Sequence, residues 1–293
     1  MHPSPNPSLK GRGTDRACQN LCAQPIGWVR KKPRFRSLRG FTLVEMSLVL
    51  VVIGLIILTV FPALNAVRAS TQTSLTNSNL QSLLRATAVY VQANGCLPCP
   101  TPASTVGNGF GRVRGDTNNT ACNGCASPEG IPPFASLGIP ALVAHDGWGR
   151  WITMRVDPTL TGGFTVVVPI TGTTGICSNT LHNSVANSVW IQPPSGSTQS
   201  AAVIFVSHGA NGYGAYVASA SAGPYNGSRM PFPNGTPSCS NGGYEQCNAG
   251  DTTQFVNAPP VTGGNNPFDD VLLYLDRNNL VSLLGNSSCQ TVW

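Results

Sequence analysis

Charge is the property that this sequence has least of, since Asp, Glu, Lys and Arg make up 10% of its 293 residues. Lysine is missing altogether after residue 40, and residues 41–293 carry eight arginines against ten acidic residues. A protein that binds the phosphates of nucleic acid needs a clustered cationic face, which this composition does not supply. The formal net charge of +6 arises in residues 1–40, where nine basic residues oppose Asp15. We therefore expect no nucleic acid among the partners of residues 41–293.

Catalytic motifs are also lacking. No serine stands in a Gly-x-Ser-x-Gly elbow, and no pair of acids forms a glycosidase motif. A hydrolase could use Ser207, His208, His145 and Asp146, but lone histidines in loops are usually structural groups. We predict that the protein is not an enzyme, and a membrane-anchored periplasmic hydrolase stays as an alternative.

A long apolar run is what the sequence does have. The 21 residues from Phe41 to Phe61 contain Glu45 as their single charge, and a helix of this length crosses about 30 Å of hydrocarbon. Six basic residues lie between positions 30 and 39 and nothing comparable follows the run. The start of the helix should therefore face the cytoplasm. A secretory signal peptide would have a shorter apolar core without an acid, and an ordinary signal anchor with a chance acid stays as an alternative.

The start of this run resembles a known signal. The residues Arg39-Gly40-Phe41-Thr42-Leu43-Val44-Glu45, the apolar stretch and Pro62 are similar to the class III signal of type IV prepilins and type II secretion pseudopilins. The resemblance implies that a prepilin peptidase cuts after Gly40, that Phe41 is methylated, and that Glu45 guides the docking of subunits into a filament. It also implies other pilin or pseudopilin subunits and an inner-membrane assembly platform as partners.

The carboxylate of Glu45 has a physical reason to take part in assembly. A charged side chain at the centre of a bilayer costs about 2.5 to 3.5 kcal/mol, so it needs a partner or an interfacial position. A cut after Gly40 would create an ammonium group on Phe41, and the first helical turn favours a negative charge. The ammonium group of a neighbouring copy would then neutralise Glu45 between two packed helices.

The chain divides into five expected regions. Pro62 should kink the long helix rather than end it. The basic segment before Phe41, residues 1–40, is unusually long for a prepilin leader, so translation is expected to begin nearer Val29. The regions are a cytoplasmic leader removed on processing (1–40), a transmembrane or filament-core helix (41–62), an amphipathic helix of the globular domain (63–95), a Cys-rich loop region (96–149) and an antiparallel sheet with long loops (150–293).

The residue pattern after the membrane segment predicts an α+β fold. Leu80, Leu83, Leu84 and Val91 recur at helical spacing, so one helix should run from about Phe41 to Asn94 and pack on a sheet. The segment 224–267 is rich in Gly and Pro and is expected to be a loop without strands. Strand-like runs are expected at 150–156, 164–170, 201–207 and 270–276, and the first two should form a hairpin. A short closing helix is expected at 277–285.

Three later stretches add to the resemblance. The runs "HDGWGRW", "SHGANGYGAY" and "FDDVLLYL" are similar to the turns and the closing strand of major pseudopilins. They imply a pilin-like fold, in which a long N-terminal helix, transmembrane in its first half, packs on an antiparallel sheet with disulfide-rich loops.

Cysteines point to an oxidising compartment. Cys18 and Cys22 belong to the leader, and the remaining chain keeps an even number, for which disulfides are the default. We expect the first two CxxC pairs to be joined to each other, with Cys239 bound to Cys247 and Cys177 to Cys289. A zinc ribbon and a redox-active "CLPC" dithiol stay as alternatives. The eight cysteines are Cys96, Cys99, Cys122, Cys125, Cys177, Cys239, Cys247 and Cys289.

Calcium is a possible ligand near the last strand. No cofactor is required by the sequence, but Asp269 and Asp270 lie beside Asn265 and Asn266 and supply the hard oxygens that calcium prefers. Some pseudopilins hold calcium in loops that flank the sheet, so the resemblance keeps such a site as the alternative. Because the ligand spacing follows no recognisable calcium loop, we expect a solvated turn that caps the last strand.

These observations together predict a structural subunit of a filament. The expected protein is a minor pilin or pseudopilin of a type IV pilus or a type II secretion machine. It should first cross the bacterial inner membrane once, with its globular domain in the periplasm, and then enter the filament or reach the cell surface. A pilus-tip adhesin that binds through its loops at 96–125 and 224–267 is the alternative from the binding class.

Overall fold

The structure is a computed structural model of the chain. It describes residues 40–102, 104–115, 122–125, 127–162, 189–193, 196–217, 228–250, 253–264, 266–276 and 279. The expected strand at 164–170, the expected closing helix at 277–285, Cys177 and Cys289 lie outside the described residues, apart from Asn279. The chain divides into two compact units, residues 1–57 and 58–293.

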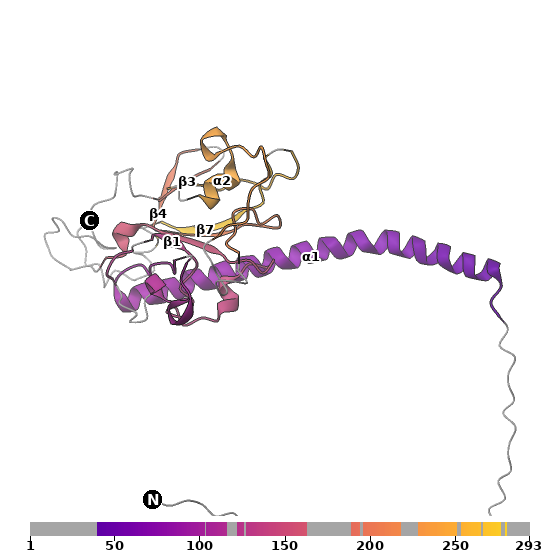
Figure 1. Ribbon diagram of the computed structural model, residues 1–293, viewed down its shortest axis with the longest axis horizontal. Coiled ribbons are helices and arrows are strands. Elements are labelled where there is room, and N and C mark those ends of the chain that lie inside the picture. The colour runs from indigo at the N-terminus through magenta and orange to yellow at the C-terminus, as the bar shows by residue number, and fades with distance from the viewer. Residues whose placement is uncertain are drawn as a thin grey trace, which may run out of the picture. The chain divides into compact units, whose positions relative to one another are not determined.

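A single long helix opens the described chain. Helix α1 (Leu43–Asn94) has 52 residues and runs without a break through Pro62 (Figure 1). It ends at Gly95, which has a φ of +75° and donates its N–H to the carbonyl of Val91. A left-handed residue of this kind is a common helix stop and costs glycine little. The helix expected from the sequence is therefore present, and its described start lies two residues later.

The second unit is built around a four-stranded antiparallel sheet in the order β1-β2-β5-β7. Strand β2 pairs with β5 over its whole length, from Thr153 opposite Val206 to Val156 opposite Val203, and β5 pairs with β7. Strand β1 lies on the other side of β2. The strands are β1 (Glu129–Gly130), β2 (Thr153–Val156), β5 (Val203–Ser207) and β7 (Val271–Leu275).

Helix α1 covers one face of this sheet. Leu80, Leu83 and Val91 are at most 1% exposed and pack in one cluster with alternate residues of the strands, among them Met154 and Phe205. The helical period on one side and the strand period of two on the other bring these side chains to one interface. This interface is the core of the second unit.

A second, smaller sheet covers the other face. Strands β3 (Val189–Gln192), β4 (Gln199–Ala201) and β6 (Gln254–Val256) pair in the order β4-β3-β6. Val189, Ile191 and Phe255 from this sheet pack with Ile204 and Val206, which point away from α1. The described part of the second unit thus has three layers, α1, the four-stranded sheet and the three-stranded sheet (Figure 1).

Two details of the fold differ from the sequence prediction. The segment 224–267 contains helix α2 (Tyr244–Ala249) and strand β6, so the expectation of a loop without strands was wrong. Strand β6 pairs in parallel with β3, and its three residues carry too short a pattern to be recognised without that partner. The structure also pairs β2 with β1 and β5 on its two sides, where a hairpin with 164–170 was expected.

Three disulfides cross-link loops of the described chain. Cys96 is bonded to Cys122 and Cys99 to Cys125, so the two CxxC pairs are joined to each other as expected. Because all four sulfurs are used in these bonds, they leave no thiolates for a zinc ribbon or a CLPC dithiol. Cys239 is bonded to Cys247, which is the third expected pair that the structure describes. Short 3-10 helices connect the loops, at Gly107–Gly109, Val113–Gly115, Ala141–Ala144, Pro158–Leu160 and Cys239–Asn241.

Candidate functional site

The residues of the expected cleavage signal lie at the exposed start of α1. Gly40 and Phe41 precede the helix and are exposed. The Thr42 hydroxyl accepts the N–H of Glu45 at 3.2 Å, and a carboxylate oxygen of Glu45 accepts the N–H of Thr42 at 3.4 Å. This reciprocal pair is a capping box, which fixes the first turn and leaves the Gly40–Phe41 peptide outside the helix. Within one chain, Glu45 is therefore a helix cap at an accessible peptide.

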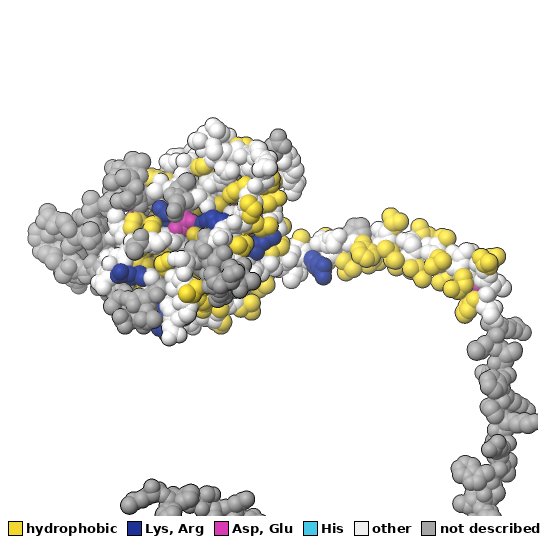
Figure 2. Space-filling view, in the orientation of Figure 1, with side chains coloured by type: hydrophobic (Ala, Val, Ile, Leu, Met, Phe, Trp, Pro, Cys, Tyr) yellow, Lys and Arg dark blue, Asp and Glu magenta, His cyan; other side chains and the backbone are white. Residues whose placement is uncertain are grey.

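The first part of α1 presents apolar side chains to its surroundings. It is the one helix among the described residues that is long and apolar enough to cross a membrane, and no residue of its most apolar window is buried. Leu43, Leu48 and Leu58 are 88%, 64% and 75% exposed, and Figure 2 shows hydrophobic side chains along this part of the helix. A core helix of a soluble domain would bury such a face, so this part of α1 is not one.

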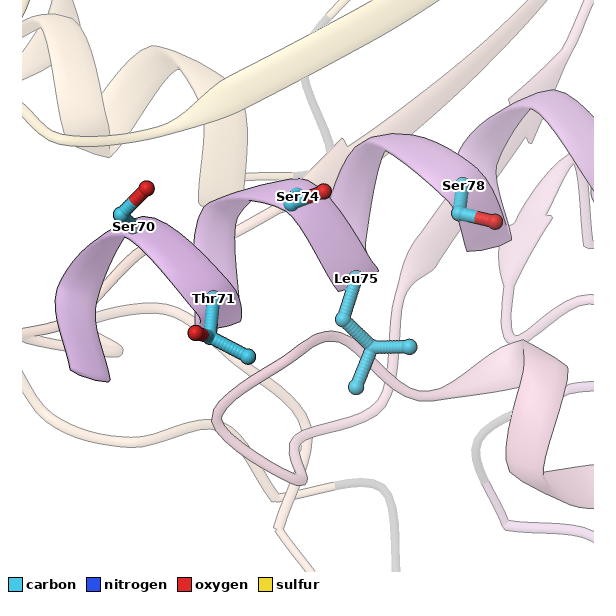
Figure 3. A pocket seen from close by; sticks show the side chains of 5 residues that line it. All are labelled: Ser70, Thr71, Ser74, Leu75 and Ser78. Atoms are coloured by element: carbon cyan, nitrogen blue, oxygen red, sulfur yellow. The ribbon is translucent and has the colours of Figure 1, made fainter. Parts of the chain in front are cut away.

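Further along, α1 carries a shallow groove of about 480 Å³. Figure 3 shows the short side chains of Ser70, Thr71, Ser74 and Ser78 along it, together with Leu75. Ser70, Ser74 and Ser78 recur every four residues and so follow one side of the helix. Small residues at this spacing allow another helix to approach closely.

Three acidic residues from separate parts of the chain meet in the second unit. Glu245 comes from α2, and Asp269 and Asp270 precede β7. One ligand oxygen from each lies within 4.8 Å of the others, and we call these three residues the carboxylate cluster. Glu245 is 1% exposed and Asp270 is 7% exposed, so the expectation of a solvated turn at these acids was wrong.

Each carboxylate is held by hydrogen bonds to one of its two oxygens. Glu245 Oε1 accepts from the Asn211 side-chain amide at 2.6 Å and from the N–H of Asp269 at 3.3 Å. Asp269 Oδ2 accepts the N–H groups of Ala210 and Asn211 at 2.8 and 2.9 Å. Asp270 Oδ2 accepts from the Asn248 side-chain amide at 2.8 Å. These donors fix the orientation of all three groups.

The second oxygen of each carboxylate has no hydrogen-bond partner. Glu245 Oε2, Asp269 Oδ1 and Asp270 Oδ1 are buried without a hydrogen-bond partner, and so is the side-chain oxygen of Asn266, three residues before Asp269 in the sequence. Buried oxygens without a partner are costly and rare in native proteins. Gly209 keeps this space open, because a Cβ there would stand 2.3 Å from Asp269 Oδ1. The three carboxylates, of which one oxygen each lies within 4.8 Å of the others, therefore keep acceptor capacity that no described donor uses.

The electrostatics of the cluster favour a cation. Burial, with the nearby Asp269 charge, raises the pKa of Glu245 to about 7. Burial, followed by the charges of Glu245 and Asp269, also raises the pKa of Asp270 well above its ordinary value. His208 lies beside Asp270, with Nδ1 3.8 Å from Oδ1, but burial and nearby arginines lower the pKa of His208 well below its ordinary value. A neutral histidine does not balance the acidic charge, whereas a bound divalent cation would.

Calcium fits this donor set. The available ligands are carboxylate oxygens, which calcium prefers, and ligands bound at about 2.3 to 2.6 Å lie at most about 5 Å apart across the ion. The cluster satisfies this separation. The structure thus brings Asp269 and Asp270 together with Glu245, while the Asn266 side-chain amide donates to the carbonyl of Gly242 and Asn265 lies outside the described residues. Sequence reasoning missed Glu245, whose one signal was an acid two residues before a cysteine in a chain with few acids.

The residues of the hydrolase alternative are not arranged as a nucleophile and its base. Ser207 donates its hydroxyl to Asp146 Oδ2 at 2.9 Å, and both side chains are buried. His208 Nε2 instead contacts the Thr153 hydroxyl at 2.9 Å, and the His145 ring lies on Trp151. The described geometry therefore gives the hydrolase alternative no support.

Comparisons of the chain with family models, curated proteins and solved structures found no match. The chemistry of the residues described above is therefore the basis of the functional proposals that follow.

Proposed function

We propose that the chain is a filament subunit of the type IV pilin and type II secretion pseudopilin class. The observation that carries this proposal is the uncovered apolar part of α1, in a helix whose later turns pack on a sheet. An apolar surface of this size is unfavourable in water, so lipid or neighbouring helices must cover it. In a filament subunit, the inner membrane covers this apolar surface before assembly, and the helices of other subunits cover it afterwards.

The proposed chemistry at the start of α1 needs two steps. A prepilin peptidase hydrolyses the Gly40–Phe41 peptide, which lies outside the helix, and Phe41 is then N-methylated. The new ammonium group stands beside the capping box, so Glu45 can exchange its bond to Thr42 for an ion pair with the ammonium of a neighbouring copy. Pairing both charges removes the cost of keeping either one in the apolar filament core.

Side-by-side packing of helices also agrees with the groove on α1. Its serines at every fourth position allow close approach, and their hydroxyl groups can bond to backbone carbonyls, as that of Thr71 does to Val67. The partners that we propose are other pilin or pseudopilin subunits and an inner-membrane assembly platform. Either a pilus or a secretion filament would use this chemistry.

Processing can be tested on the full chain in bacterial membranes that contain a prepilin peptidase. We expect intact mass measurement to give a chain that starts at Phe41 and carries one additional methyl group. Residues 41–293 contain no lysine, so an amine-reactive tag should label the processed chain at its N-terminus alone. Gly40→Leu should block processing, and Gly54→Ala is the matched control, because a Cβ at Gly40 or Gly54 meets no other atom within 4 Å. Membranes that contain uncut chain alone would contradict the proposal.

Assembly is tested by Glu45→Gln. We expect normal expression and processing with loss of filaments, or loss of secretion if the filament serves a secretion machine. A Glu45→Gln chain that functions as well as the parent would instead favour the tip adhesin or the anchored hydrolase.

We also propose that the carboxylate cluster binds calcium as a structural ion. Glu245, Asp269 and Asp270 would hold it through their carboxylate oxygens, one of which on each residue has no hydrogen-bond partner. The ion would neutralise the buried acids and tie α2 to the start of β7. Calorimetric titration of the purified chain with calcium chloride should show binding that Asp270→Asn weakens.

A further inference from the structure

One acid of the carboxylate cluster, Glu245, lies in a loop that a disulfide closes. Glu245 lies between Cys239 and Cys247, which are bonded to each other. Asp269 and Asp270 belong to the segment before β7, more than twenty residues further along the chain. The position of Glu245 in the cluster therefore depends on what fixes α2 against that segment.

Helix α2 has little intrinsic stability. It has six residues, and Gly243 at its N-cap makes no side-chain capping bond. Helices this short do not persist alone in water. The disulfide holds Cys247, which is 1% exposed, and the Asn248 side chain bonds to the backbone of Val256 and to Asp270. Glu245 itself accepts hydrogen bonds from Asn211 and from the N–H of Asp269.

The loop before α2 is a tight turn with close backbone contacts, which restrict its conformation. The N–H of Gly243 donates to the carbonyl of Ser238 at 2.9 Å, and a Cβ on Gly243 would stand 1.8 Å from the Pro237 carbonyl oxygen. Gly242 has a φ of +85°, in the region that favours glycine. The disulfide closes this tight turn, and the turn directs the first residues of α2 toward the cluster.

Electrostatics would separate the acids if the loop were free. Glu245 is buried beside Asp269 and Asp270, and like charges at this distance repel one another strongly at low dielectric. Asn211 and the N–H of Asp269 donate hydrogen bonds to Glu245 Oε1 and hold it against this repulsion in the closed loop. A flexible α2 would relieve the repulsion by moving Glu245 into water, and the cluster would keep two acids.

We propose that the Cys239–Cys247 disulfide makes this cluster a three-carboxylate site, so that the oxidised chain binds calcium more tightly than a chain with two thiols at these positions. This inference rests on the proposed calcium site and is independent of filament assembly. Reduction by dithiothreitol breaks the sulfur–sulfur bond, places a hydrogen on each sulfur and oxidises the dithiol to its cyclic disulfide. Closure of a loop this short restrains enough conformational freedom to change the calcium affinity by about tenfold to a hundredfold.

The inference has a reciprocal consequence. If the disulfide strengthens calcium binding, bound calcium must make the same disulfide harder to reduce, and by the same factor. The disulfides Cys96–Cys122 and Cys99–Cys125 lie outside the loop that carries Glu245, so their reduction should not respond to calcium through this coupling.

The experiment is a calorimetric titration with calcium chloride of the full chain purified in detergent. The double variant Cys239→Ser/Cys247→Ser should bind about tenfold to a hundredfold more weakly than the parent. Cys96→Ser/Cys122→Ser is the matched control and should bind as the parent does. Glu245→Gln should weaken binding with the disulfide intact, and it should add little when combined with the Cys239→Ser/Cys247→Ser change. Circular dichroism shows whether each variant keeps its secondary structure.

The two proposals fail in different ways. A parent chain that binds no calcium would overturn the calcium site itself. A second outcome is that the parent binds calcium and Glu245→Gln weakens binding, but Cys239→Ser/Cys247→Ser does not. The calcium site would then be supported, and the proposed role of the disulfide would be wrong. The reciprocal measurement needs no variant, because mass mapping of cysteines after equilibration with dithiothreitol should show less reduction of Cys239–Cys247 in calcium than without it. Equal reduction in both conditions would also contradict the role of the disulfide.

Discussion

Gly147 is the position where the turn before β2 touches α1, and its replacement gives a sharp prediction. A Cβ on Gly147 would lie 2.0 Å from the carbonyl oxygen and 2.7 Å from the Cα of Gln72. These are backbone atoms in the middle of a helix and cannot turn aside. The Gly147→Ala chain must therefore move its turn away from α1 by more than 1 Å to reach an ordinary contact distance.

The cost of that movement follows from the contacts that hold the turn. The N–H of Gly147 donates to the buried hydroxyl of Thr76 at 2.9 Å, and the Asn79 side chain donates to the carbonyl of His145 at 2.7 Å. Overpacking costs about 1 to 3 kcal/mol, and loss of one such hydrogen bond adds about 1 kcal/mol. We expect Gly147→Ala to lower the free energy of unfolding by about 2 to 4 kcal/mol.

The assay is denaturant unfolding of the chain in detergent, followed by the fluorescence of Trp148 and Trp151. Gly149→Ala is the matched control in the same turn, because Gly149 has a φ of +81° but no atom within 4 Å of its Cβ position. Its cost should be backbone strain alone, about 1 to 2 kcal/mol. In a Thr76→Val background the bond is already lost, so Gly147→Ala should cost less there. If Gly147→Ala costs no more than Gly149→Ala, the close approach to α1 does not stabilise the fold.

Two further predictions concern stability. Replacing either Cys96–Cys122 or Cys99–Cys125 by two alanines should lower the free energy of unfolding by about 2.5 kcal/mol, because the remaining disulfide still closes the long loop. Replacing both should lower it by about 6 kcal/mol, because nothing then closes that loop in the unfolded chain. Additive losses in denaturant unfolding would contradict this. Burial lowers the pKa of His145, so as the pH falls below 6.5 the unfolded chain takes up the proton first and the folded chain loses stability. His145→Gln should remove this part of the pH dependence, and an unchanged slope would refute the assignment.

The sequence and the structure agree best where the signal is local. The period of Leu80, Leu83 and Val91 predicted the helix face that packs on the sheet, and apolar runs bounded by turn residues predicted β2, β5 and β7. Each signal lies within a few residues, and the element forms because those residues share one face. The cross-joined CxxC pairs were also expected, although the spacing of the cysteines does not by itself choose a connectivity.

The parts that the sequence did not reveal depend on partners far along the chain. Strand β6 exists through its parallel pairing with β3, and its own three residues are too few to declare a strand. Glu245 and Asp269 are 24 residues apart, and neither carries a spacing that predicts the other as a co-ligand. Asn266 was predicted as a neighbour of the acids, but its unpaired oxygen became visible in the folded chain alone.

The sequence by itself determined which segment is apolar enough for lipid, where its single acid stands and which loops carry cysteines, because these are properties of consecutive residues. The tertiary structure alone decided that Gly147 lies on α1, that a second sheet covers the first and that three acids share one buried volume. Such contacts form when chain segments that are distant in sequence are brought together by the packing of α1 on the sheet, and no local pattern records that outcome.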